Sequence, residues 1–326
     1  MEPQEFWSPN EETVTSYKEL VDVIEDVFSK WQREKNKVFA WRGQVDSSWP
    51  LYSSLYRRLA WTRSTQPEER DLAREEAKIL TSTHRWGLHV SDSGGRLSVL
   101  AQLAALQHFG APTRLIDVTF NPWIGAWFAA EDKWDNAIPK HEDADARLFA
   151  VDVTGRLINE NDDYRDWEDC LKRPWPTERD PADLTEAELE ARQRLRRLWS
   201  TKVFAWRAPR YNTRIAAQNG GFLLGGVPTS RGQEGPNQWP KDDEGYWSID
   251  DVRRATSLSL RPHKLRVKHG GVSQDAVYTI RITASAKQEI RNRLQKGFGY
   301  THSSMYPDFT GFASFGTPEL KTRQGV

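Results

Sequence analysis

The chain has 326 residues, of which 37% are hydrophobic, so it can bury a sizeable core without disulfides. Basic and acidic residues both number 46, so no net charge draws the chain to nucleic acid or to a membrane. A single cysteine, Cys170, excludes an intramolecular disulfide and the usual cysteine cluster of a metal site, and we expect no metal centre. The sequence has neither a membrane span nor a signal-peptide pattern, so we expect a cytoplasmic protein without membrane partners.

The first half of the chain predicts helices that alternate with short strands. Ser16 and Glu19 form a capping box, and apolar residues then recur at helical spacing from Tyr17 onward. Asn121 followed by Pro122 is typical of another helix start. In chain order we expect a helix from 17 to the charged stretch 32–37, a strand over 37–41, helices over 67–85 and 98–109, a strand over 113–119, a helix from 122 to about 132, a polar loop over 133–145 and a strand over 147–153.

The second half mixes regular elements with charged and turn-rich segments. Thr185 and Glu188 form a capping box, and Ser285 and Gly297 mark the expected ends of the last helix. In chain order we expect an irregular segment over 159–183, a helix over 186–199, strands over 203–206 and 214–224, a flexible loop over 228–245, a strand over 276–282 and a helix over about 286–296. These elements predict an α/β (α+β) fold in which a single mixed sheet has flanking helices. We expect one domain, 1–326, with insertions at about 159–199 and 228–262.

Three segments resemble one known family: FAWRGQ (39–44), LAALQHFGAPTRLIDVTFNPWIGAWFAAE (103–131) and RIAAQNGGF (214–222). With MYPDFTGFA (305–313), they make about 15–315 similar to the FRG domain, which is named for a Phe-Arg-Gly motif on its first strand. Two positions depart from the family pattern: Trp41 stands where Phe is usual, and Val118 replaces the Trp of a DWT turn. Several FRG domains occur near bacterial stress or phage-defence genes, so the resemblance implies a role such as a toxin or a phage-defence effector.

The order of motifs in the FRG domain is similar to that in ADP-ribosyltransferases, which implies an ADP-ribosyltransferase-like core. Those enzymes place an Arg or His on the first core strand, a Ser/Thr-rich strand that runs into a helix, and a Glu or Gln on a later strand. The matching positions here are Arg42, the segment 113–119 with 126–129, and Gln218. The resemblance therefore implies NAD as the cofactor and a macromolecular acceptor, protein or nucleic acid.

Arg42, Gln218 and Glu131 are the catalytic candidates. Arg42 ends a short apolar strand, and its guanidinium is suited to hold a pyrophosphate through two parallel hydrogen bonds. At the place of Gln218 the transferases use a Glu that stabilises positive charge developing on the ribose. A neutral Gln supplies no charge, so NAD cleavage requires Glu131 or Asp308 in the site, and Gln218→Glu is expected to raise NAD hydrolysis. The alternatives are a solvated helix end for Glu131 and a turn former for Asp308.

Further residues are expected to contact the nucleotide. Gly43 would let the backbone approach the ligand, and His108 at a helix end either binds it or caps carbonyls. Arg114 and Asp117 are expected to face opposite sides of their strand, so that one is buried in a pair and the other lies in the cleft. A structural role, such as tying the 119–121 turn, is expected for Asp117. If 214–224 is a regular strand, Arg214 and Gln218 share one face. The expected cofactor-binding residues are Arg42, Gly43, His108, Thr113, Arg114, Thr119 and Arg214. One cleft is expected to gather Arg42, Thr113, Arg114 and Gln218.

Two function classes remain open. The first is an ADP-ribosyltransferase-like enzyme, which Arg42 and the intact motif run favour by analogy. The second is a non-catalytic module that holds a nucleotide or a nucleic-acid end in the same cleft, which the neutral Gln218 favours. Its contact surface would be the basic stretches 191–214 and 253–269. The sequence contains no GxxxxGK[ST] loop, no GxGxxG after a strand, no HExxH and no GxSxG.

Overall fold

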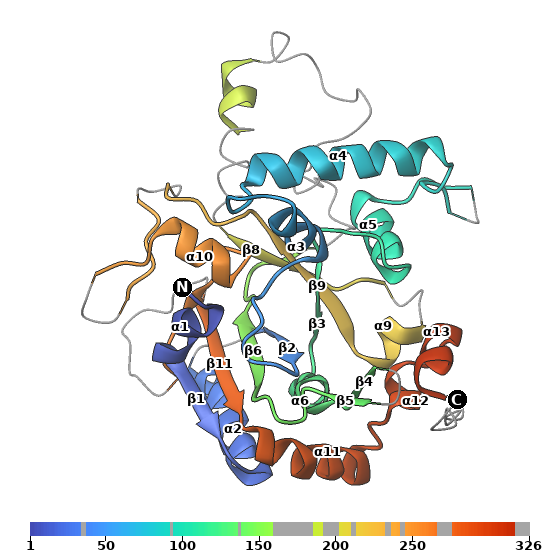
Figure 1. The fold of residues 1–326 in the computed structure, drawn as a ribbon. Coiled ribbons are helices and arrows are strands. Elements are labelled where there is room, and N and C mark those ends of the chain that lie inside the picture. The colour runs from blue at the N-terminus through green and yellow to red at the C-terminus, as the bar shows by residue number, and fades with distance from the viewer. Residues whose placement is uncertain are drawn as a thin grey trace, which may run out of the picture.

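A computed structural model of the chain describes residues 1–33, 37–91, 94–135, 138–158, 185–191, 202–209, 213–231, 236–241, 245–265 and 276–316. Within these residues, nine strands form a mixed sheet in the order β1-β11-β6-β2-β3-β9-β8-β7, and β10 also pairs with β11 (Figure 1). The strands are β1 Glu11–Val14, β2 Phe39–Gln44, β3 Ile116–Thr119, β6 Ala146–Asp152, β7 Leu157–Ile158, β8 Val203–Trp206, β9 Gly220–Gly225, β10 Arg261–Pro262 and β11 Ala276–Ile282.

The centre of the sheet is antiparallel, because β11, β6, β2, β3, β9 and β8 pair with one another in that sense. The pairs β1–β11, β10–β11 and β7–β8 at its margins are parallel. The expected mixed α/β architecture, with one open mixed sheet and flanking helices, is therefore confirmed.

Helices cover both faces of the sheet (Figure 1). They are α1 Pro3–Trp7, α2 Tyr17–Arg33, α3 Ser54–Trp61, α4 Glu69–Arg85, α5 Val99–His108, α6 Pro122–Ala130, α9 Thr213–Ala217, α10 Ile249–Ala255, α11 Ala284–Phe298, α12 His302–Met305 and α13 Phe309–Gly311, with short turns over Ser8–Asn10 and Phe312–Gly316. One core cluster joins α2, α6 and α11 to the sheet, while others join α1 and α10, and α4 and α5, to it. None of the described helices has the length and apolar composition that a membrane span needs.

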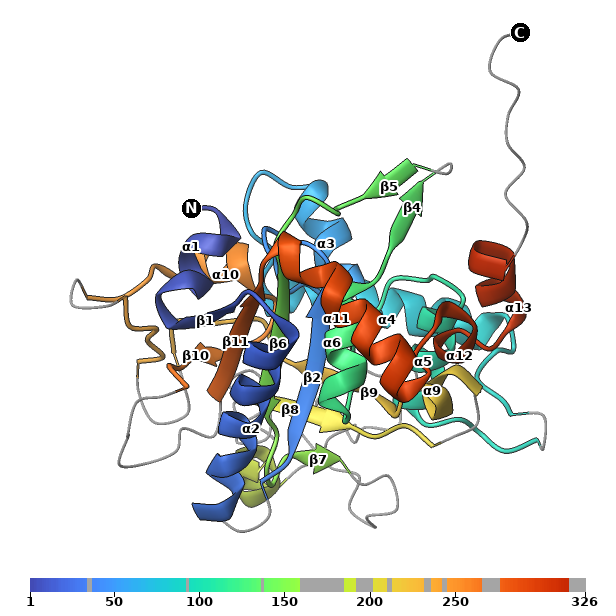
Figure 2. The same ribbon diagram turned by 90° about the horizontal axis from the view of Figure 1, so that it is seen from below.

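Helix α6 lies directly on β2 because both elements carry a glycine at their crossing (Figure 2). A Cβ atom on Gly43 would stand 2.2 Å from the carbonyl oxygen of Gly125 and 2.3 Å from the amide nitrogen of Ala129. No side chain fits in that space. This glycine is therefore required by helix packing. Gly43 also lines the cavity described below, so its expected contact with a ligand stays a prediction.

Most of the expected elements are present, and the errors have local causes. Residues expected as a polar loop contain the hairpin of β4 Lys133–Asp135 and β5 Ile138–Lys140. The expected strand 214–224 is instead the short helix α9, then a turn at Asn219 with φ of 44°, then β9. Thr283 rather than Ser285 precedes the last long helix, and Gly299 with φ of 72° rather than Gly297 ends it.

Some elements have signals that sequence reasoning did not use. Ser53 accepts a hydrogen bond from the amide of Tyr56 and begins α3, and Ser248 begins α10 in the same way. The Thr185–Glu188 capping box forms, and residues 186–191 are helical after it. The rest of the helix expected to 199, Cys170, and the irregular segment 159–183 lie outside the described residues.

Candidate functional site

The sheet splits between β2 and β3. These strands share one backbone pair, Trp41 with Thr119, whereas β2 pairs with β6 along its whole length. A cavity of about 380 Å³ lies at this split. Its lining comes from both diverging strands, from α5, α6 and α9, and from Tyr306 near the C-terminus. The cavity therefore gathers residues from all three segments that resemble the FRG domain.

Arg42 bridges the split. Its Nη1 atom donates to the carbonyl oxygen of Asp117 at 2.6 Å, in place of the backbone bond that the diverging strands no longer make. Burial lowers the pKa of Arg42, Asp117 opposes that shift and the nearby Arg57 adds to it. Within the described residues, the buried Nε atom of Arg42 has no hydrogen-bond partner. A guanidinium in this position is stabilised by any anion that enters the cavity.

Glu131 follows the last residue of α6 and its side chain is buried, with 2% of the residue exposed. Its Oε1 atom accepts from the Tyr306 hydroxyl at 2.8 Å and lies 3.6 Å from His302 Nε2. Its Oε2 atom lies 2.5 Å from Lys133 Nζ. The alternative of a solvated helix end is therefore wrong. Burial, followed by the charge of Glu131, raises the pKa of Tyr306, so its hydroxyl remains a donor at neutral pH.

Arg214 and Gln218 both line the cavity, but helical spacing rather than strand alternation brings them together. The Gln218 amide nitrogen donates to the Met305 carbonyl at 2.9 Å. Arg214 donates to both carboxylate oxygens of Asp308, at 2.8 and 2.7 Å. Asp308 also accepts from the Gly311 amide at the start of α13, as expected of a turn former. The hydrogen bond from Arg214 is the main cause that lowers the pKa of Asp308.

Asp117 belongs to the cavity, although sequence analysis gave it a structural role. Its carboxylate accepts from the Gln107 amide nitrogen at 2.8 Å, and both residues line the cavity beside His108. The 119–121 turn is tied by Thr119 instead, whose hydroxyl accepts from the Asn121 amide and donates to the Gln218 carbonyl. The expected role of Asp117 in that turn is corrected, whereas its expected placement on the opposite side from Arg114 is confirmed, since Asp117 lines the cavity and Arg114 pairs with Glu76. Thr119 both lines the cavity and fixes the end of α9.

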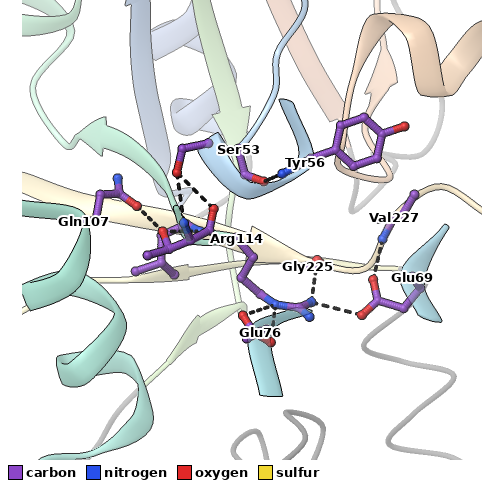
Figure 3. A network of polar contacts seen from close by, with 11 residues as sticks. Ser53, Tyr56, Glu69, Glu76, Gln107, Arg114, Gly225 and Val227 are labelled. Atoms are coloured by element: carbon purple, nitrogen blue, oxygen red, sulfur yellow. Dashed lines mark hydrogen bonds and ion pairs between the residues drawn. The ribbon is translucent and has the colours of Figure 1, made fainter. Parts of the chain in front are cut away.

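Arg114 points away from the cavity into a buried ion-pair network (Figure 3). Its Nε atom lies 2.7 and 2.9 Å from the two oxygens of Glu76, and its Nη1 atom lies 3.1 Å from Glu69. Glu69 in turn accepts from the Val227 amide at 2.9 Å. The network ties α4 to the end of β9, and the expectation that Arg114 contacts the ligand is corrected.

Thr113 also lies behind the cavity rather than in it. Its hydroxyl donates to the side-chain oxygen of Gln107, which does line the cavity. Of the four residues expected in one cleft, Arg42 and Gln218 converge, while Thr113 and Arg114 do not. Tyr306, Lys133 and Asp117 are among the lining residues that sequence reasoning did not assign to the site. Two of them lie in segments that the FRG resemblance had already singled out, Tyr306 in MYPDFTGFA and Asp117 in the segment 103–131, whereas Lys133 had no such signal.

The comparison with protein-family models finds the FRG domain over residues 37–137. The chain therefore contains an FRG domain at these residues. The matched FRG region holds Arg42, His108 and Glu131, whereas Arg214, Gln218 and Tyr306 approach the cavity from beyond it. No curated protein and no solved structure matches the chain significantly.

Proposed function

We propose that this FRG domain-containing protein binds NAD in the cavity and transfers ADP-ribose to a macromolecular acceptor. The observation that carries the proposal is the meeting of Arg42, Gln218 and the buried carboxylate of Glu131 in one cavity. The similarity in motif order to ADP-ribosyltransferases supports the proposal. The strands that contain or directly follow those motifs, β2, β3 and β9, are neighbours in the sheet. A transferase of this kind would suit a toxin or a phage-defence effector.

The residues present suit a dinucleotide. A volume of about 380 Å³ lies within the range of small-molecule sites, roughly 300–1,000 Å³. Arg42 supplies a half-buried cation for a phosphate group, and the rings of Trp49 and Phe128 line the same cavity as flat apolar surfaces. Polar groups that fix orientation and apolar walls that exclude water are what a nucleotide site needs.

Glu131 would supply the negative charge that Gln218 lacks. NAD contributes the ADP-ribose group, and the ribose gains positive charge as its bond to nicotinamide weakens. Lys133 is 38% exposed at its side chain, so water can replace its contact with Glu131 Oε2 while Tyr306 still holds Oε1. A carboxylate fixed in this way stabilises the developing charge without first having to reorganise.

A binding module without catalysis is the second candidate, and one observation favours it. Both oxygens of Glu131 are already engaged, and the neutral Gln218 donates to a backbone carbonyl. On this interpretation the cavity holds a nucleotide or a nucleic-acid end through Arg42. Much of the basic surface expected over 191–214 and 253–269 lies outside the described residues.

Incubation of the full chain with NAD labelled in the adenylate part, in the presence of cell lysate, separates the two candidates. Transfer of label to protein or nucleic acid, with stoichiometric release of nicotinamide, is the result expected of the enzyme. Saturable binding of NAD with neither label transfer nor free nicotinamide would replace the enzyme by the binding module. Absence of both binding and release would exclude NAD as the ligand.

A further inference from the structure

One short segment near the C-terminus contacts three of the residues assigned to the site. We name residues 305–308 the C-terminal strap. The Met305 carbonyl accepts from Gln218 at 2.9 Å, the Tyr306 hydroxyl donates to Glu131 at 2.8 Å, and Asp308 holds Arg214 through two bonds of 2.8 and 2.7 Å. The same segment therefore reaches both α9 and the end of α6.

These contacts are not those of a loosely attached surface segment. The side chains of Arg214 and Asp308 are only 23% and 19% exposed, and their pairing is bidentate, which is the stronger geometry for an ion pair. The Arg214 guanidinium also lies 5.1 Å from the centre of the Tyr306 ring. The Tyr306 ring packs in turn against Trp127, Phe128 and Phe315.

The contacts with the strap occupy most of the Arg214 guanidinium and leave few of its hydrogen-bond donors for a ligand. Two of its donor nitrogens are directed at Asp308, and its flat face lies over Tyr306. An arginine held in this way orients its own helix rather than a phosphate. Arg42, whose Nε atom has no partner among the described residues, remains the cation for the anionic part of the ligand.

We infer that the C-terminal strap is a positioning element of the site: Tyr306 orients the Glu131 carboxylate, and Asp308 fixes α9 through Arg214. Arg214 is then a positioning residue instead of a ligand contact. The functional unit extends from the matched FRG region at 37–137 to residue 308, and the first region alone lacks the groups that hold Glu131 and Gln218 in place. The part that concerns Glu131 rests on the proposed function, whereas the part that concerns α9 does not.

Two conservative variants of the full chain test the strap. Tyr306→Phe removes the hydroxyl and keeps the ring contacts, and Asp308→Asn removes the charge while an asparagine still caps α13. Phe309→Ala is the matched control, because this neighbouring side chain is 94% exposed. Two readouts are measured for each protein: hydrogen exchange of the amides in 213–219, and the kcat and KM of nicotinamide release from NAD.

Loss of a hydrogen bond to a charged group predicts that Tyr306→Phe lowers kcat by about 10- to 100-fold while KM changes less than about threefold. Asp308→Asn is expected to raise exchange in 213–219 by about fivefold or more, with the central strands unchanged. Phe309→Ala is expected to match the wild type in both readouts. A merely structural role for Tyr306 would change global exchange and leave kcat proportional to the folded fraction.

The two hypotheses fail in different ways. If the wild type releases no nicotinamide, the proposed function is lost, and faster exchange in 213–219 of Asp308→Asn still supports the strap. If the wild type is active and both variants match it in turnover and in exchange, the strap is overturned and the proposed function stands. Unchanged exchange together with an inactive wild type overturns both.

Discussion

Glu76 and Glu131 are both buried glutamates, but their partners differ. Glu76 lies in the α4 helix, and both of its oxygens face the Nε atom of Arg114, whose side chain is as buried as its own. Glu131 lies at the cavity, where one oxygen accepts from Tyr306 and the other meets the partly exposed Lys133. The Arg114–Glu76 pair is buried on both sides, and only the outer partner of Arg114, Glu69, is partly exposed. Glu131 instead contacts a partly exposed cation directly, and water can replace that contact.

This difference separates a structural charge from a charge that can act. A buried ion pair holds its geometry because either partner alone would be an uncompensated charge in a low dielectric. Although burial opposes it, the carboxylates Glu69 and Glu76 raise the pKa of Arg114, so the arginine stays charged throughout. The Glu131 carboxylate lies beside a cavity that a ligand can enter, which is the arrangement that the proposed function requires of an electrostatic catalyst.

The largest loss of stability is expected from breaking the buried Arg114–Glu76 pair. Arg114→Met leaves Glu76 buried without its cation, and the free energy of unfolding should fall by about 3–5 kcal/mol. Urea unfolding followed by tryptophan fluorescence measures it. Arg70→Met is the control, because Arg70 lies on α4, the helix that carries Glu76, and its side chain is 82% exposed. This variant should change the free energy of unfolding by less than about 0.5 kcal/mol. A loss below about 1 kcal/mol for Arg114→Met would show that the network is not structural.

Glu131→Gln tests the other member of the comparison. The amide keeps the size of the side chain and its bond to Tyr306, but it removes the negative charge. If the proposed function holds, nicotinamide release should fall by roughly 10²–10³-fold while NAD binding persists. Glu75→Gln on the surface of α4 is the control, and it should be as active as the wild type. Turnover that survives Glu131→Gln would place the required charge on another group, of which Asp117 is the cavity-lining candidate.

Sequence reasoning succeeded where the signal is local. The capping boxes and the Asn121–Pro122 start predicted their helices because caps and periodicity act within one or two turns. It placed Arg42 and Gln218 in one cavity because they lie in segments that a whole family pattern relates. These successes depend on residues that are near neighbours or that belong to a recognised motif.

It failed where a tertiary partner decides the role. Arg114 pairs with side chains 38 and 45 residues earlier in the chain, and nothing near it in sequence indicates that they are buried together. Glu131 and Tyr306 are 175 residues apart, so the exposure of Glu131 could not be judged from the end of its own helix. The helix α9 was mistaken for a strand because its apolar residues fit either period over so short a run.

Arg42→Ala should weaken ligand binding without unfolding the chain. The guanidinium is a half-buried cation of the cavity, and removing a charge-assisted contact should reduce NAD affinity by about 10- to 100-fold. Calorimetric titration with NAD measures this change. Arg58→Ala, an exposed arginine of α3, is the control. Equal affinity in a folded Arg42→Ala protein would remove Arg42 from the site.

The sequence predicted that Gln218→Glu raises NAD hydrolysis, whereas the contacts of Gln218 in the structure predict that it slows the reaction. The Gln218 amide nitrogen donates to the Met305 carbonyl. A carboxylate in its place has no hydrogen to donate, so this hydrogen bond would be lost. We expect slower nicotinamide release, by roughly fivefold, and faster hydrogen exchange in 213–219. Steady-state kinetics decides the matter: a rise in turnover would mean that residue 218, rather than Glu131, is the position where negative charge is required.

The smallest effect is the pH dependence of the strap. Arg214 lowers the pKa of Asp308 in the folded protein, so the pair contributes stability above the ordinary aspartate pKa of about 4. As the pH falls through the lower folded pKa, Asp308 takes up a proton and that contribution is lost. The stability difference between wild type and Asp308→Asn should therefore be about 1 kcal/mol at pH 6 and should shrink as the pH is lowered below the ordinary aspartate pKa.

Comparing the two proteins isolates this pair, because other carboxylates with lowered pKa values, such as Asp46 and Asp71, titrate in both. Urea midpoints measured at pH 6, 4, 3 and 2 give the difference directly, and salt should reduce it at pH 6 since the pair is partly exposed. A difference that stays constant down to pH 2 would mean that the Asp308 charge contributes nothing. The strap would then depend on the Tyr306 and Met305 contacts, and Arg214 would again be a candidate for contact with the ligand.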